Sequence, residues 1–222
     1  MPKERKNVDR RRKPVLILEC DSDTLASQNL AVGVELSAWL EVFFPRNPLH
    51  LLQSRTRADL LKEFAALKQS GQSFGNVVVI GHSNRSGLKI NADDFITWEA
   101  VGGWLELFDP RRLFLLACEA GQWLPCAALF KKLPKLDEIV GSPVPANKEQ
   151  QYFILASVLH QLDAKQADSE LIKMLQIGNF LLNKGVMFRQ TRTTYERGGR
   201  EQGEIWTHIA EPLIDQILKK LR

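Results

Sequence analysis

Two apolar runs in the chain are bounded by polar residues, and each ends on a reactive side chain. They are residues 76–83 (NVVVIGHS) and residues 112–119 (RLFLLACE). Four or five consecutive apolar residues predict a strand that is buried on both faces, which is typical of a parallel sheet. Because ligands and chemistry gather at the carboxyl ends of the strands in open parallel sheets, we expect His82 and Cys118 to lie at the same edge.

The rest of the chain alternates between strand-like and helix-like patterns. Short apolar runs predict strands, whereas helically spaced apolar residues and capping residues predict helices. Repeated units of this kind predict an α/β fold with a mainly parallel sheet and helices on both faces. The predicted strands span residues 15–19, 49–53, 76–83, 112–119 and 138–141, and the predicted helices span residues 27–43, 56–71, 93–107, 122–133 and 170–183, with a further helix capped by Asn147.

The C-terminal part of the chain departs from this alternation. Residues 186–195 and 204–209 have strand-like patterns, and a glycine-rich loop at residues 198–203 joins them. This pattern predicts an antiparallel β-hairpin at a sheet edge, followed by an amphipathic helix at residues 211–222. The chain has no internal repeat and no low-complexity linker, so we expect one domain over residues 14–222.

The net charge of +4 is concentrated at the N-terminus. Residues 1–13 hold seven basic and two acidic side chains, so the remaining chain has a net charge of −1. Such a tail could bind nucleic acid, acidic lipid or an acidic partner. No aromatic residue is interleaved with the basic ones, and no basic stripe continues into the domain, so we expect a solvated, disordered tail instead.

The cysteine count and the lengths of the apolar runs bear on the cellular compartment. Cys20, Cys118 and Cys126 are odd in number and lack the spacing of metal ligands, which argues against a disulfide framework or a zinc site. A reducing cytoplasm fits this composition best, and no cofactor is expected. No run approaches the roughly 20 apolar residues of a membrane span, and the run at residues 15–18 ends at Glu19, too early for a secretory signal. We therefore expect a cytoplasmic protein without a membrane span.

The motifs at the two strand ends resemble those of a known family. Residues 81–83 (GHS) after one buried strand, and residues 113–121 (LFLLACEAG) one β–α unit later, resemble the caspase-like cysteine peptidases, most closely their CHAT branch. In that branch a histidine follows one strand and an Ala-Cys-Glu-Ser-Gly-like motif follows the next. The resemblance extends over roughly residues 15–162 and implies a three-layer α/β/α sandwich. Two positions differ from the family pattern, since Ser83 replaces a glycine and Ala120 replaces a serine.

The resemblance implies a cysteine endopeptidase mechanism. The Cys118 thiolate would attack a peptide carbonyl and form an acyl-enzyme, with His82 as the general base and acid. The backbone N–H groups of Ser83 and Cys118 would bind the oxyanion, as the corresponding groups of the family do. A serine in place of glycine disfavours a positive φ at that position, so Ser83 is the residue at which the implied mechanism differs most from the family.

The resemblance also implies where the substrate binds. In these peptidases the pocket for the residue before the cut is built partly from the loop after the first strand, here residues 20–23 (CDSD). The carboxylates of Asp21 and Asp23 would favour Arg or Lys in that pocket through charge-assisted hydrogen bonds. The alternative interpretation is that these residues only form a turn or a helix cap. Residues 192–200 are expected to be an exposed segment suited to self-cleavage.

Two other functional classes remain as alternatives. Residues 81–85 (GHSNR) imitate the Gly-x-Ser-x-Gly elbow of α/β-hydrolases, which would make Ser83 a nucleophile, although Arg85 replaces the second glycine. A caspase-like fold could also serve as a non-catalytic binding or scaffold module.

A peptidase core of this size has no obvious sensor domain. We therefore expect control by a regulatory partner protein or by homodimerisation, in addition to a protein substrate. The family resemblance suggests an effector in a bacterial defence or cell-death response.

Overall fold

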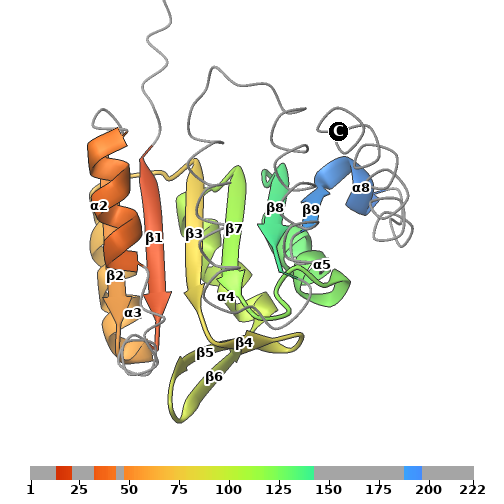
Figure 1. Ribbon diagram of the computed structural model, residues 1–222, viewed down its shortest axis with the longest axis horizontal. Coiled ribbons are helices and arrows are strands. Elements are labelled where there is room, and N and C mark those ends of the chain that lie inside the picture. The colour runs from red at the N-terminus through yellow and green to blue at the C-terminus, as the bar shows by residue number, and fades with distance from the viewer. Residues whose placement is uncertain (1–13, 22–32, 44–47, 143–187, 197–222) are drawn as a thin grey trace, which may run out of the picture.

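A six-stranded sheet forms the centre of the molecule (Figure 1). The computed structural model describes residues 14–21, 33–43, 48–142 and 188–196. The strand order is β2-β1-β3-β7-β8-β9, and every neighbouring pair is parallel except β8 and β9, which are antiparallel. The strands are β1 (Val15–Cys20), β2 (Leu49–Ser54), β3 (Asn76–Gly81), β7 (Arg112–Ala117), β8 (Glu138–Gly141) and β9 (Phe188–Thr191). The predicted α/β class and mainly parallel sheet are confirmed.

Helices cover both faces of this sheet because its strands are apolar on both sides. Leu16, Val77 and Leu113 belong to one hydrophobic cluster with the buried residues of α3, α4 and α5. Ile17 and Val78, whose side chains point to the opposite face, are also fully buried, and α2 packs beside β1 and β2 on that side (Figure 1). The helices are α2 (Gly33–Phe43), α3 (Arg57–Gln69), α4 (Trp98–Leu105), α5 (Trp123–Lys132) and α8 (Arg192–Glu196), with a 3₁₀ turn η1 (Glu106–Phe108) after α4.

The start of α3 agrees with the capping residues in the sequence. Thr56 is the N-cap, and its hydroxyl oxygen accepts a hydrogen bond of 3.1 Å from the backbone N–H of Asp59. Leu60 and Phe64 are buried against the sheet, whereas Leu61 is 41% exposed. The helix ends before Gly71, which has a φ of +69° that favours glycine.

A second, three-stranded antiparallel sheet was not predicted. It consists of β4 (Ser83–Asn84), β5 (Gly87–Asn91) and β6 (Asp94–Thr97), and it projects beyond the carboxyl end of β3 (Figure 1). The prediction of a helix over residues 93–107 is therefore wrong for residues 93–97. Alternation of the exposed Phe95 with the buried Ile96 favours a strand there, and the helix begins only at Trp98.

The C-terminal hairpin prediction is corrected at its first strand. β9 ends at Thr191, and residues 192–196 form the helix α8 instead of continuing as a strand. The other predicted C-terminal elements, the glycine-rich loop and the helix capped by Asn147 lie outside the described residues, as does the basic tail.

Arg192 is the first residue of α8, and its guanidinium binds backbone carbonyls at and after the end of α5. Its Nε donates to the carbonyl of Leu136 at 2.7 Å, and its Nη2 donates to the carbonyl of Phe130 at 3.3 Å and to that of Leu133. The last carbonyls of α5 have no partner within their helix and carry negative partial charge, so an arginine there is favourable. The Arg192 side chain is only 23% exposed. The expectation that residues 192–200 form an exposed cleavage site is therefore wrong for Arg192.

Tyr195 adds an aromatic contact to the same helix. Its ring stacks on Phe130, with centroids 5.2 Å apart, and lies 5.6 Å from the ring of Trp123. Trp123 is the first residue of α5. The segment 188–196 is therefore attached both to the sheet edge, through β9, and to the helix that follows Cys118.

We expect Arg192→Ala to lower the free energy of unfolding by about 1–3 kcal/mol, because the substitution removes the hydrogen bonds to the part-buried carbonyls of Phe130, Leu133 and Leu136. The neighbouring and exposed Thr193 provides the matched control, and Thr193→Ala should change stability by less than about 0.5 kcal/mol. Urea denaturation of both variants measures the difference. Equal stability of the two variants would contradict this role of Arg192.

Candidate functional site

His82 and Cys118 follow neighbouring strands that are paired in parallel. The register of β3 and β7 runs from Asn76 opposite Arg112 to Gly81 opposite Ala117, and the two candidate residues come next in each strand. Adjacent strands in a sheet lie about 4.8 Å apart. The structure therefore brings His82 and Cys118 to the same edge of the sheet, at its carboxyl end.

Two hydrogen bonds connect the segments that follow these strands. The Ser83 hydroxyl donates to the backbone carbonyl of Cys118. Two residues further along, the backbone N–H of Arg85 donates to Oε2 of Glu119 at 3.1 Å. Residues far apart in the sequence are joined in both cases, so the position of one segment depends on that of the other.

The turn after Cys118 is tight. Glu119 has a φ of +58°, which is uncommon for a residue with a side chain, and its carbonyl accepts a hydrogen bond of 3.1 Å from Gln122. Gly121 donates its N–H to the carbonyl of Ser142 at 2.7 Å. A Cβ at Gly121 would lie 2.4 Å from the carbonyl oxygen of Gly141, so only glycine fits this close approach to the end of β8.

The three cysteines lie in different environments. Cys118 is partly exposed, whereas Cys20 and Cys126 are buried. Burial, followed by the negative charges of Glu19 and Asp21, raises the pKa of Cys20 to about 12, and burial alone raises the pKa of Cys126. A thiol with a raised pKa forms little thiolate near neutral pH and reacts slowly. Cys118 is therefore the cysteine whose exposure suits a nucleophile.

His82 is partly exposed as a residue, but its Nε2 is buried. Within the described part of the chain this nitrogen has no hydrogen-bond partner, whereas buried polar atoms in proteins usually have one. The backbone carbonyl of His82 accepts a hydrogen bond of 2.8 Å from the N–H of Lys89. A purely structural histidine is expected to use its ring nitrogens in hydrogen bonds, and the described residues provide no such bond for Nε2.

Ser83 has an ordinary backbone conformation. Among the described residues, positive φ values occur outside glycine at Asp21, Asp109 and Glu119, so serine in place of glycine at position 83 causes no strain. The chain continues from Ser83 into β4 instead of a helix, and a nucleophile elbow requires a turn from strand to helix. This geometry does not favour Ser83 as a nucleophile.

Asp21 is buried and paired. It lies directly after β1, is 4% exposed, and has a φ of +56°, which Asp tolerates better than most residues. Its Oδ2 is 3.1 Å from Nζ of Lys89, and its N–H donates to the carbonyl of Ile90 at 2.8 Å. The carboxylate predicted to bind a substrate cation therefore already has a cation from β5. The other predicted pocket residue, Asp23, lies outside the described residues.

Lys89 and the turn that precedes it were not predicted from the sequence. The Asn84 side chain accepts hydrogen bonds from the N–H groups of Ser86 at 2.7 Å and Gly87 at 3.2 Å, an Asx turn that begins a hairpin. An Asn-x-x-Gly turn followed by the alternating residues 87–91 (GLKIN) was the available signal for this hairpin.

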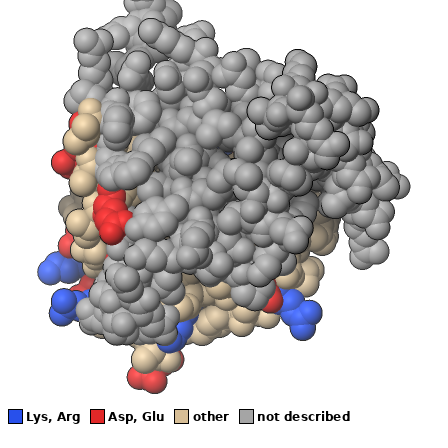
Figure 2. Space-filling model, in the orientation of Figure 1, with Lys and Arg blue, Asp and Glu red and all other residues tan. Residues whose placement is uncertain are grey.

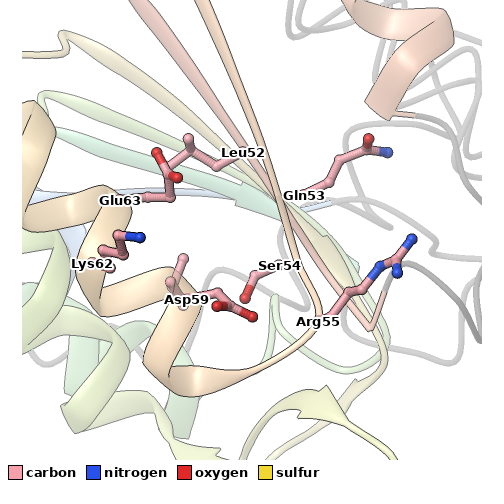
Figure 3. A pocket seen from close by; sticks show the side chains of 8 residues that line it. Leu52, Gln53, Ser54, Arg55, Asp59, Lys62 and Glu63 are labelled. Atoms are coloured by element: carbon pink, nitrogen blue, oxygen red, sulfur yellow. The ribbon is translucent and has the colours of Figure 1, made fainter.

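A hollow of about 220 Å³ lies at another part of the described structure, between the end of β2 and α3 (Figure 3). Asp59, Lys62 and Glu63 contribute charges of both signs to its lining, and neither His82 nor Cys118 borders it. Because the charges are mixed, the hollow favours no single class of ligand.

The described residues include no group of three metal-ligating side chains, and none of their helices has the length and apolar character of a membrane-crossing segment. Figure 2 shows acidic and basic side chains interspersed on the described part of one face.

Comparison with known proteins gives no family assignment. No protein-family model matches the chain, and no curated protein matches it.

Proposed function

We propose that this chain is a caspase-like cysteine endopeptidase in which Cys118 is the nucleophile and His82 is the general base and acid. The observation that carries the proposal is the register of β3 and β7, which pairs Gly81 with Ala117 and so brings the next residue of each strand to one edge. The order of the motifs matches that of the CHAT branch, and a thiol and an imidazole at adjacent strand ends are a combination suited to acyl transfer.

The proposed reaction has two halves. The Cys118 sulfur attacks the carbonyl carbon of a peptide bond as its proton passes to His82. The resulting oxyanion collapses, the C–N bond breaks, and His82 gives the proton to the leaving amine. Water then attacks the thioester with His82 as the base, the C–S bond breaks, and the thiol is regenerated with a carboxylic acid product.

The backbone N–H groups of Ser83 and Cys118 are the proposed oxyanion donors. Ser83 and Leu88 face each other in β4 and β5. Because the N–H of Lys89 donates to the carbonyl of His82, the backbone groups of Ser83 and Leu88 do not bond to each other. The N–H of such a residue points away from the partner strand. The Ser83 N–H is therefore directed away from β5, which supports its use by a substrate.

Substrate preference rests on the resemblance alone. Cleavage after a basic residue would require that residue to compete with Lys89 for the carboxylate of Asp21, or to bind Asp23. Control by a partner protein or a homodimer, a cytoplasmic location and an effector role in bacterial defence or cell death are likewise proposals carried by the resemblance.

We expect iodoacetamide to label Cys118 alone in the folded chain at about pH 7.5, since the other two thiols are buried and have raised pKa values. Unfolding in urea should make Cys20 and Cys126 react as well. Peptide mapping by mass spectrometry identifies the labelled residues. If Cys20 or Cys126 is labelled as fast as Cys118 in the folded chain, the exposure of Cys118 no longer identifies it as the nucleophile.

Cys118→Ala should lower kcat/KM on a fluorogenic peptide library by at least about 10³-fold, because the acyl-enzyme cannot form. Cys126→Ala is the matched control, since it removes a buried thiol from α5, and it should retain turnover. Persistent turnover in Cys118→Ala, or a parent chain without turnover, would refute the cysteine peptidase proposal. The second result would favour a binding or scaffold module.

His82→Ala should lower kcat by about 10²–10⁴-fold, the usual contribution of a general acid–base group, while slow alkylation of Cys118 remains measurable. His50→Ala is the control, because His50 lies on β2 and contacts Phe74 with its ring, 5.2 Å between centroids. If His82→Ala and His50→Ala have equal turnover, His82 has no catalytic role.

A further inference from the structure

The two hydrogen bonds that cross from the segment after β3 to the segment after β7 involve the candidate nucleophile directly. One acceptor is the carbonyl of Cys118 itself, and the other is the side chain of the next residue, Glu119. Both donors, the Ser83 hydroxyl and the Arg85 N–H, lie within three residues of His82. The two bonds therefore limit changes in the distance between the segment that carries His82 and the segment that carries Cys118.

The donor side of these bonds is held by strand pairing and by a buried tryptophan. Ser83 and Asn84 form β4, which pairs with β5, and the indole Nε1 of Trp98 donates to the carbonyl of Asn84 at 2.9 Å. Trp98 is only 1% exposed. Because a buried tryptophan and a β-ladder fix this short strand, the Ser83 hydroxyl is presented to Cys118 from a rigid support.

The acceptor side is conformationally unusual. Glu119 has a left-handed backbone with a φ of +58°, a state that persists in a residue with a side chain only when its surroundings hold it. The hydrogen bond of 3.1 Å from Arg85 to its carboxylate is a contact of this kind. The turn that begins at Cys118 is therefore fixed by its neighbours and not by its own backbone preference.

We propose that Ser83 and Glu119 are positioning residues, which hold the Cys118 thiol in place relative to His82. The catalytic part of this inference rests on the proposed function, whereas the effect on thiol reactivity does not. It also assigns a role to the serine that replaces the glycine of the resembling family, because a glycine at position 83 has no hydroxyl to donate.

Three serine variants test the first bond. Ser83→Ala should lower kcat by about 10–100-fold with KM changed by less than about threefold, since misplacement of a reacting group slows chemistry more than binding. The rate of Cys118 alkylation near neutral pH should fall by about tenfold, which corresponds to the loss of one hydrogen bond. Ser83→Thr retains the hydroxyl and should restore both rates, and Ser86→Ala, an exposed serine in the adjacent turn, should match the parent.

Two glutamate variants test the second bond. Glu119→Gly accepts the left-handed backbone without strain but has no side-chain acceptor, so thermal stability should be unchanged or higher while kcat and the alkylation rate fall. Glu119→Gln keeps an acceptor oxygen and should remain within about threefold of the parent in both rates. A fall in both rates without a loss of thermal stability in Glu119→Gly distinguishes positioning from a purely structural role.

The inference is overturned if Ser83→Ala and Glu119→Gly both match the parent in alkylation rate, or if Ser83→Thr is as impaired as Ser83→Ala. Failure of the proposed function is a separate result. If the parent chain has no turnover but the alkylation rates of the Ser83 and Glu119 variants differ from the parent as expected, the peptidase proposal is refuted and the positioning of Cys118 is supported.

Discussion

Parallel pairing of β3 with β7 in one register is the constraint on which the proposed site depends. Each strand is buried on both faces, and the side chains of a strand alternate between the two faces, so a slip of one residue would exchange the two sets of packed side chains. Packing thus resists any change of register. Since Gly81 and Ala117 are partners, the fold that buries the two apolar runs also brings the residues after them to the same edge.

The elements around this edge limit how far the two segments can move. On one side, the small antiparallel sheet is connected to the residue that follows β1 by the ion pair of Lys89 with Asp21, and to α3 by hydrogen bonds from Arg57 to Asp94. On the other side, α5 follows the Cys118 turn, and Arg192 binds the carbonyl of Phe130 near the end of this helix and that of Leu136 after it. Sites supported by packed elements of this kind hold reacting groups more accurately than isolated loops do.

Sequence patterns predicted the main strands well, because a strand that is buried on both faces is mostly apolar. They failed where local patterns are ambiguous. Phe95, Ile96 and Trp98 occur at a spacing that also fits a helix, and the strand β6 is explained by its pairing with β5. The exposed-segment prediction failed at Arg192 because its acceptors on Phe130, Leu133 and Leu136 are far away in the sequence. The candidate dyad could be found from the strand ends, whereas the contacts that support it are tertiary.

The most direct test of the account is whether positions 82 and 118 are neighbours in solution. Strands about 4.8 Å apart bring equivalent Cα atoms within the roughly 4.4–6.8 Å that a disulfide requires. Mild oxidation of the His82→Cys variant should therefore link the new thiol to Cys118, as mapped by mass spectrometry, whereas Asn76→Cys at the other end of β3 should not form this link. A His82→Cys chain in which Cys118 remains unlinked, or in which the new thiol joins Cys20 instead, would contradict the account.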